Sequence, residues 1–191
     1  MKVTKAQAQE NRQRIVETAS VLFRERGYDG VGVADLMAAA GFTHGGFYKH
    51  FGSKADLMAE AAAYSFARSA AQTSEANIAD FVQHYLSREH RDVPGNGCTM
   101  ASLCADASRQ SEPIKETFAA GIESQLATLA SKDSMLSESE LREARASQIA
   151  IIAQAVGAVL LSRSCPDDSP LVDEILAVCR ADILSRYCKS S

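Results

Sequence analysis

Proline and strand-like patterns are scarce in this sequence. Only four prolines occur among 191 residues, and all of them lie after residue 90. The alternation of apolar and polar residues that is typical of strands is missing, and apolar residues recur instead at spacings of three and four. These patterns predict an all-α protein of about nine helices with no internal repeat.

Other absences narrow the class of protein. The five cysteines have an odd count and no Cys-x-x-Cys pair, so neither a disulfide framework nor a zinc site is expected. No apolar run approaches the roughly 20 residues that span a bilayer. The first residues are polar and do not resemble a signal peptide. We therefore expect a cytoplasmic protein with no membrane partner, no metal and no cofactor.

The sequence also lacks the residue patterns of an active site. No Ser-His-Asp order, phosphate-binding loop or pair of carboxylates at helical spacing stands out, so no catalytic residue is predicted. The net charge of −4 is unevenly spread. Residues 1–60 hold eight basic and seven acidic side chains, whereas the remaining residues hold twelve and seventeen. This balance permits an N-terminal region that faces DNA.

Apolar periodicity and capping residues locate the individual helices. In the N-terminal part, helices are predicted over residues 5–26 and 33–40, after Thr43, and over 54–74. In the C-terminal part, they are predicted over 77–87, 98–109, 113–132, 137–164 and 170–188. The segment 88–97 is predicted to be a loop because it contains one proline and two glycines.

Residues 33–51 have the pattern of a helix-turn-helix. Gly41 supplies the tight turn, because glycine tolerates a positive φ, and Thr43 is the expected cap of the second helix. Phe47 and Phe51 are predicted to lie in the core. The exposed residues of the second helix are small or polar enough to approach DNA base edges, and they are Thr43, His44, Gly45, Gly46 and Lys49.

The stretch from Ala39 to Leu57 closely resembles the signature of the TetR/AcrR family of transcriptional regulators. It reads AAGFTHGGFYKHFGSKADL, against the family pattern A-A-G-V-S-x-G-x-x-Y-x-H-F-x-S-K-x-x-L, with Phe42 and Thr43 in place of the V-S pair. The resemblance covers roughly residues 10–60. It implies a DNA-binding domain over residues 1–55 and a ligand-binding and dimerisation domain over residues 56–191.

The resemblance also assigns contacts to individual residues. Thr43, His44, Gly45 and Gly46 would lie against bases or flanking phosphates. Tyr48 and His50 would contact the DNA backbone, and Lys54 would pair with a phosphate. His44 and Lys49 are the leading candidates for sequence readout. Gly32 departs from the family, which usually has Thr or Ser nearby, so one hydroxyl contact is lost.

The C-terminal half resembles one branch of the family. Residues 97–106 follow a G-C-x-x-x-x-L-x-A-[DE] pattern similar to that of NemR and the LmrA/YxaF group. Cys98, at a helix N-terminus that lowers a thiol pKa, is a candidate thiol sensor, with inert packing as the alternative. The last two helices are apolar on more than one face and are predicted to form a homodimer interface.

A pocket for a small hydrophobic or electrophilic effector is expected in this half. The predicted lining residues are Phe66, Phe81, Tyr85, Met100, Cys104, Phe118, Ile122 and Gln154. His84 and His90 are predicted to be surface or hydrogen-bonding residues rather than metal ligands.

The expected function is that of a repressor released from a palindromic, double-stranded operator by its effector. Three alternatives stay open: a regulator that needs a corepressor, an activator, and a helical ligand-binding or interaction protein that has lost DNA binding.

Overall fold

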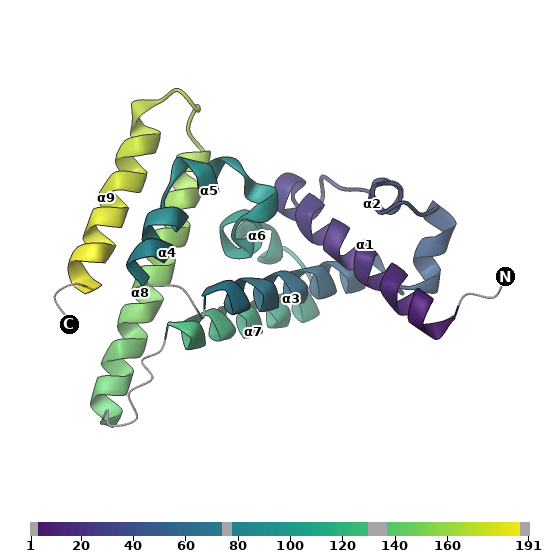
Figure 1. The fold of residues 1–191 in the computed structure, drawn as a ribbon, viewed down its shortest axis with the longest axis horizontal. Coiled ribbons are helices and arrows are strands. Elements are labelled where there is room, and N and C mark those ends of the chain that lie inside the picture. Colours follow the sequence, from purple (N-terminus) through teal and green to yellow (C-terminus); the bar gives the residue numbers. More distant parts are fainter. Residues whose placement is uncertain (1–3, 74–77, 130–136, 188–191) are drawn as a thin grey trace.

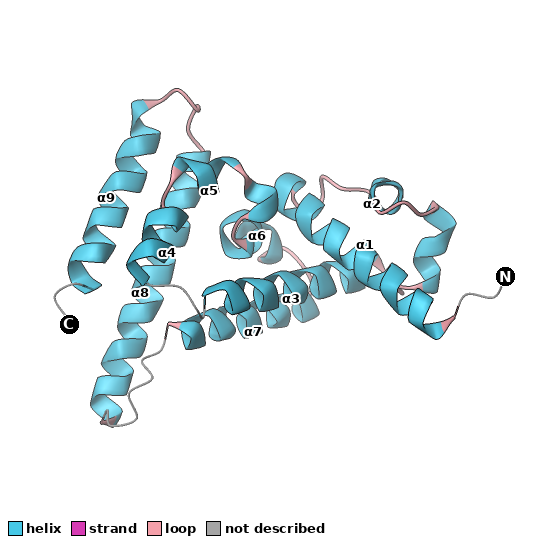
Figure 2. Cartoon of the chain, viewed as in Figure 1, coloured by secondary structure: helices cyan, strands magenta, loops and turns pink. Residues whose placement is uncertain are grey.

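The computed structural model describes residues 4–73, 78–129 and 137–187, and within these ranges it contains helices and loops but no strand (Figure 2). The all-α prediction is confirmed. The N-terminal elements are α1 (Lys5–Arg26), α2 (Val33–Ala39), the 3₁₀ helix η1 (His44–Lys49) and α3 (Lys54–Thr73). They are followed by α4 (Ile78–Tyr85), α5 (Arg88–Asp92), the 3₁₀ helix η2 (Pro94–Asn96) and α6 (Thr99–Ala107). The last three are α7 (Glu112–Thr128), α8 (Glu138–Arg163) and α9 (Pro170–Tyr187).

The helices form an elongated molecule whose two ends are built from different helices (Figure 1). At one end, α1, α2, η1 and the start of α3 form a small head near the N-terminus. At the other end, α8 and α9 pack side by side. Between them, α3 runs along α7, and α6 contacts α1, α3, α7 and α8. The middle of the molecule therefore connects the head to the α8–α9 pair.

Local sequence determines where the long helices begin and end. The Thr4 hydroxyl accepts a hydrogen bond from the backbone N–H of Gln7 at 3.2 Å and caps α1, which ends at Gly27 with a φ of +73°. At the start of α8, Ser137 and Glu140 form the predicted capping box, each side chain bonding the other residue's backbone N–H. The boundaries predicted for α1 and α8 are confirmed to within one residue.

Two clusters of buried apolar side chains form the core. The first includes residues of α1, α2, η1 and α3 and continues without a break into α6 and α7, where Leu103, Ile114 and Phe118 belong to it. The second joins α4, α8 and α9 and contains Leu86, Val159 and Ile183. The first cluster therefore extends past residue 55, the predicted domain boundary. The hydrophobic core is continuous across that boundary, and the assignment of separate functions to the two sides stays a prediction.

The prediction of a loop over residues 88–97 is wrong for most of that segment. Residues 88–92 form α5 because the Ser87 hydroxyl accepts a hydrogen bond from the backbone N–H of His90 and caps the turn. Arg91 is buried, and its Nη1 lies 2.6 Å from carboxylate oxygens of both Asp92 and Asp167. These tertiary contacts hold a helix that is too short to be stable alone.

Helix α8 is more apolar than the sequence analysis recognised. An 18-residue window has a mean hydropathy of 1.5, so the helix is long and apolar enough to cross a membrane by length and composition alone. The buried helix of a globular protein meets the same criteria, so they carry little weight. Together α8 and α9 expose several large apolar side chains, namely Leu141, Ile149, Leu160, Leu161, Leu171 and Val178. The two helices thus present more apolar surface than the monomer covers.

Candidate DNA-binding surface and effector cavity

The turn of the helix-turn-helix is made by Gly41. Its φ is +80°, a value that L side chains rarely adopt, and the prediction of a positive φ is confirmed. Immediately after it, the backbone N–H of Phe42 donates to the Met37 carbonyl at 2.7 Å, which closes the turn on the end of α2. The chain then enters η1, whose backbone direction is fixed by this turn.

Buried aromatic rings hold η1 against the rest of the head. Phe47 and Phe51 are almost fully buried, with ring centroids 5.5 Å apart, as the sequence predicted. The neighbouring Tyr48 is 69% exposed, although its ring meets that of Phe47 edge-on. Burial of one face therefore turns the other face of η1 outward.

Most of the predicted DNA-contacting residues share this outward face. Thr43, His44, Gly45, Tyr48 and Lys49 are exposed, whereas Gly46 and His50 are half-buried. A Cβ placed on Gly45 would meet no atom within 4 Å, so no described residue covers that part of η1. The structure thus brings these side chains together, and their contact with DNA stays a prediction.

Lys54 lies differently from its neighbours. Its ammonium group donates a hydrogen bond of 2.5 Å to the Tyr28 carbonyl and lies 6.0 Å from the centroid of the Phe23 ring. In this structure the side chain therefore joins the start of α3 to the loop after α1. The predicted phosphate contact would have to use the remaining N–H groups of the same ammonium.

Arg14 of α1 is a candidate DNA contact that the sequence analysis missed. Its guanidinium is exposed and stacks 4.4 Å above the centroid of the Phe42 ring, beside the turn. This contact also explains how the head accommodates Phe42, which is larger than the usual valine. Position 32 behaves as expected for glycine, because Gly32 begins α2 without a side-chain hydrogen bond.

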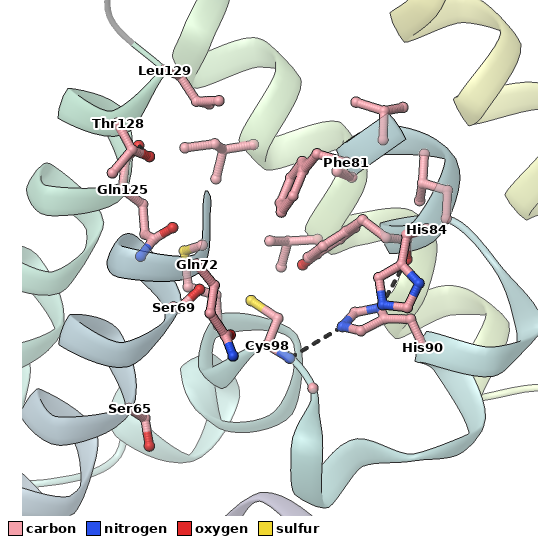
Figure 3. Close-up of a pocket in the computed structure, with 18 of the residues that line it drawn as sticks. Ser65, Ser69, Gln72, Phe81, His84, His90, Cys98, Gln125, Thr128 and Leu129 are labelled. Carbon is pink, nitrogen blue, oxygen red and sulfur yellow. Dashed lines mark hydrogen bonds between the residues drawn. The ribbon is translucent and has the colours of Figure 1, made fainter. Parts of the chain in front are cut away.

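A cavity of about 770 Å³ lies between α3, α4, α6, α7 and α8 (Figure 3). Three residues of the predicted pocket, Phe81, Tyr85 and Met100, line it, and so does Cys98. Its apolar wall on α8 consists of Ile151, Ile152, Ala155 and Val156. A volume of this size suits a small organic molecule.

Five residues predicted to line the pocket lie elsewhere. Phe66 and Phe118 pack edge to face in the first core cluster, with ring centroids 5.3 Å apart, and Cys104 and Ile122 are packed against that cluster. Gln154 points toward α9, where its side-chain amide donates to Asp182 at 2.8 Å. Apolar spacing on a helix marks its inward face, but a core and a cavity both lie inward, which is why these positions were misplaced.

His90 is fixed in one neutral form at the edge of the cavity. Its Nδ1 lies 2.8 Å from the Tyr85 carbonyl, while its Nε2 accepts a hydrogen bond from the backbone N–H of Cys98 at 3.2 Å (Figure 3). The Nδ1 must therefore carry the proton and donate. Burial lowers the pKa of His90 to about 4. The predicted hydrogen-bonding role of this residue is confirmed, whereas the neighbouring His84 is exposed.

The Tyr85 hydroxyl is a buried polar group in the wall of the cavity. The side chain is buried, and within the described part of the chain its oxygen makes no hydrogen bond of ordinary geometry, the Cys98 thiol being the polar side chain that acts on it most strongly. Burial, followed by the nearby Cys98 thiol, raises the pKa of Tyr85 well above its usual value. A neutral hydroxyl in a cavity wall can donate to or accept from a bound molecule.

The cavity is linked to the head by side chains of α1 and α6. Arg24 of α1 lines the cavity and donates to the Gly95 carbonyl at 3.0 Å through Nε. At the other end of α6, an Asp106 carboxylate oxygen accepts a hydrogen bond from the backbone N–H of Tyr28 at 2.9 Å. A movement of α6 would therefore be transmitted to the end of α1.

Among the described residues, no group of His, Cys, Asp and Glu is arranged to hold a metal ion.

Comparison with known proteins gives matches in the head and along the whole chain. Residues 15–61 match the model of bacterial regulatory proteins of the tetR family. The transcriptional regulator AcrR of Shigella flexneri is 34% identical over 85 residues, which cover 44% of this chain and 35% of that protein. The match thus spans about a third of the length of this curated relative.

Two further relatives align over nearly their full length. The transcriptional regulator LmrA of Bacillus subtilis is 26% identical over 93% of this chain and 98% of its own. The structure of reduced NemR from E. coli superposes with a TM-score of 0.70 at 21% identity and covers 91% of this chain and 95% of that one. The similarity of the C-terminal half to LmrA and of its fold to NemR agrees with the sequence-based resemblance.

Proposed function

Since the chain belongs to the TetR family of bacterial regulatory proteins, we propose that it is a dimeric, DNA-binding transcriptional regulator controlled by a small molecule. A repressor that leaves its operator when the effector binds is the form that we expect. Such a protein works beside the chromosome in the bacterial cytoplasm. We propose no cofactor, because the binding of DNA and of an effector requires none.

The outward face of η1 carries this proposal. Phe47 and Phe51 anchor the helix from inside, so the exposed His44, Tyr48 and Lys49 project outward from the head. Polar and cationic side chains on a protruding helix suit the major groove and its flanking phosphates. The exposed guanidinium of Arg14 adds a positive charge beside the same turn.

A second copy of the chain is the partner that we propose for α8 and α9. Leu160 and Leu161 are 46% and 60% exposed, and Val178 on α9 is 60% exposed. Gly157 has open space where its Cβ would lie, which permits the close approach of another helix. A two-fold pairing on this face would carry two heads, as a palindromic operator requires, with recognition segments about 34–36 Å apart.

The cavity is the proposed effector site. It has an apolar wall, the buried Tyr85 hydroxyl and the half-buried Cys98 thiol, which suit a small hydrophobic molecule or an electrophile that reacts with the thiol. The effector would act by binding one arrangement of the heads more tightly than another, so that the affinity for DNA falls by the ratio of the two affinities.

The proposal is tested by fluorescence anisotropy on DNA from the upstream region of the protein's own gene, at two salt concentrations. We expect tight binding that weakens with salt and resists random competitor DNA. Replacement His44→Ala should change the preference among operator variants by about tenfold, since one base contact contributes about 1–3 kcal/mol of discrimination. Replacement of the exposed His84, far from η1, is the matched control.

The outcomes separate the alternatives. Binding that appears only after a small molecule is added indicates a corepressor. Increased transcription from the bound promoter indicates an activator. Binding no tighter than to random DNA, at every upstream fragment and with every added ligand, would mean that the helix-turn-helix has lost its function and the proposal fails.

A further inference from the structure

Arg24 is a buried cation in the cavity wall whose bonds are all to neutral groups. The residue is 8% exposed and donates through Nε and Nη2 to the Gly95 carbonyl and through Nη1 to the Ser65 hydroxyl. Within the described ranges, no carboxylate forms an ion pair with it. A guanidinium has five N–H donors, so two of them are left without a partner in these contacts.

A second arginine increases the positive charge at the same place. Arg68 of α3 also lines the cavity, is exposed and makes no ion pair within the described residues. Burial and then the charge of Arg68 lower the pKa of Arg24. Buried cations in proteins are normally paired with an anion, because taking the charge out of water is costly.

The other charged groups around the cavity do not balance the two arginines. Asp80 of α4 is the one carboxylate among the described lining residues, and it is exposed. His90 is held neutral by its two hydrogen bonds, and His84 is exposed on the same side as Asp80. The Glu25 carboxylate raises the pKa of Arg24 only as the smallest of several causes. The lining thus has an excess of positive charge near α1 and α3.

The rest of the cavity is suited to an apolar chain or ring. Phe81 of α4, Met100 of α6 and three residues of α8, Ile152, Ala155 and Val156, form its wall. One part of the cavity is therefore cationic, and the part formed by α4, α6 and α8 is largely apolar, while Gln125 and Thr128 add polar groups on α7. A ligand that matches both parts has an anionic head and a hydrophobic body.

We infer that the effector of this cavity is a hydrophobic carboxylic acid, with its carboxylate held by Arg24 and Arg68 and its body against α4, α6 and α8. This inference deepens the proposed function and rests on it, because a bound acid is an effector only if the chain is a regulator controlled by a ligand. Two free N–H groups on one guanidinium suit the paired oxygens of a carboxylate.

The same geometry connects the bound acid to the head through α1. Arg24 belongs to α1, and on that helix Ile15, Ala19 and Phe23 form part of the first core cluster beneath the helix-turn-helix. A carboxylate on the two free N–H groups of Arg24 acts on the same guanidinium that holds α1 to η2 through the Gly95 carbonyl. Binding of an acid would therefore act directly on one contact between the head and the cavity wall.

The test compares straight-chain acids of six to twelve carbons with the alcohols of the same length, by isothermal titration calorimetry on the full chain without DNA. At least one acid, such as octanoate, should bind at least tenfold tighter than its alcohol. Replacement Arg68→Ala, at an exposed position, and Arg24→Gln should each weaken acid binding at least tenfold. Both should change alcohol binding by less than twofold. Arg142→Ala, on the exposed surface of α8, is the control.

The inference is overturned if no acid binds at millimolar concentration, if every alcohol equals its acid, or if Arg68→Ala and Arg24→Gln both retain full acid affinity. Arg24→Gln could fail to fold, since Arg24 ties α1 to η2, and Arg68→Ala then decides alone. DNA anisotropy is measured separately with each acid. Acid selectivity without operator binding leaves the ligand class standing and contradicts the regulator, whereas operator binding without acid selectivity does the reverse.

Discussion

The head buries its large apolar side chains, whereas the α8–α9 pair exposes several of its own. In the head, Phe23, Leu36 and Phe47 are buried completely, and Tyr48 is the large aromatic residue left outside. On α8 and α9, large aliphatic residues such as Leu161 and Val178 lie on the surface. The head is therefore complete within one chain and turns polar groups outward, whereas the α8–α9 pair has the surface of half an interface.

The seam between the two core clusters explains where the cavity lies. Within α6, Met100 and Leu103 belong to the first cluster, while Ala101 belongs to the second. Cys98 and Val156 pack against both clusters, and both line the cavity. A molecule bound there contacts α1 and α3, which carry the head, and α8, which carries part of the proposed interface. The position suits a ligand that changes how one region is held relative to the other.

The largest expected effect is a loss of stability when a buried aromatic ring of the head is removed. Replacement Phe47→Ala should lower the free energy of unfolding by about 3–5 kcal/mol, because a fully buried ring leaves a cavity when it is removed. Urea denaturation followed by circular dichroism measures the change. The adjacent Tyr48→Ala is the matched control, since that ring is mostly exposed and its loss should cost less than about 1 kcal/mol.

The two aromatic variants also separate stability from binding. Tyr48→Ala should keep the fold and weaken DNA binding, whereas Phe47→Ala should weaken both. If Tyr48→Ala proved as unstable as Phe47→Ala, the head would not be divided into a buried and an exposed face as the structure has it.

The next effect acts on the outer side of α8. Replacement Leu160→Glu should weaken dimer formation by about a hundredfold, because a carboxylate would be buried opposite an apolar surface without a partner. Sedimentation equilibrium measures the association. Val93→Glu changes an apolar side chain of similar exposure near η2, away from this face, and should leave the dimer intact. An unchanged association of Leu160→Glu would show that another surface pairs the subunits.

Local signals were sufficient to predict the long helices. The cap at Thr4, the capping box of Ser137 and Glu140 and the glycines that end α1 and α2 all act over four residues or fewer. Residues 88–97 were mispredicted because α5 depends on partners far along the chain, such as Asp167 for Arg91. A proline and two glycines are visible in the sequence, whereas an ion pair across the fold is not.

The two sites differ in the same way. The residues of the η1 face are neighbours in the sequence, so a short pattern could bring them together. The cavity collects side chains from seven α-helices and from connecting segments, and apolar spacing does not distinguish Phe66, in the core, from Phe81, in the cavity wall. Arg24 was missed because it lies on α1, a helix assigned to the head. Its burial and its bonds to neutral groups come from the tertiary fold, and no short pattern in the sequence marks them.

The smallest expected effect concerns His90, which lies between the two regions. Its pKa is about 4 in the folded chain, against 6.5 for an ordinary histidine, so between these values the unfolded chain binds more protons. Stability should therefore rise with pH across this window and be lost as the pH falls through it. Between pH 7 and pH 5.5 the loss amounts to about 1 kcal/mol. The exposed carboxylates with lowered pKa, Glu123, Glu140 and Asp173, titrate below that range.

The measurement is urea denaturation at the two pH values for the native chain, His90→Gln and His84→Gln. His90→Gln loses two hydrogen bonds and should be less stable at both pH values, so the informative quantity is the difference between them, which should shrink by about 1 kcal/mol. His84→Gln should keep the full difference, because that side chain is exposed. An equal pH dependence in all three proteins would mean that His90 is as accessible to protons folded as unfolded. The wall between α5 and α6 would then be open to water, and the two regions would be less tightly joined than the packing of Cys98 against both clusters indicates.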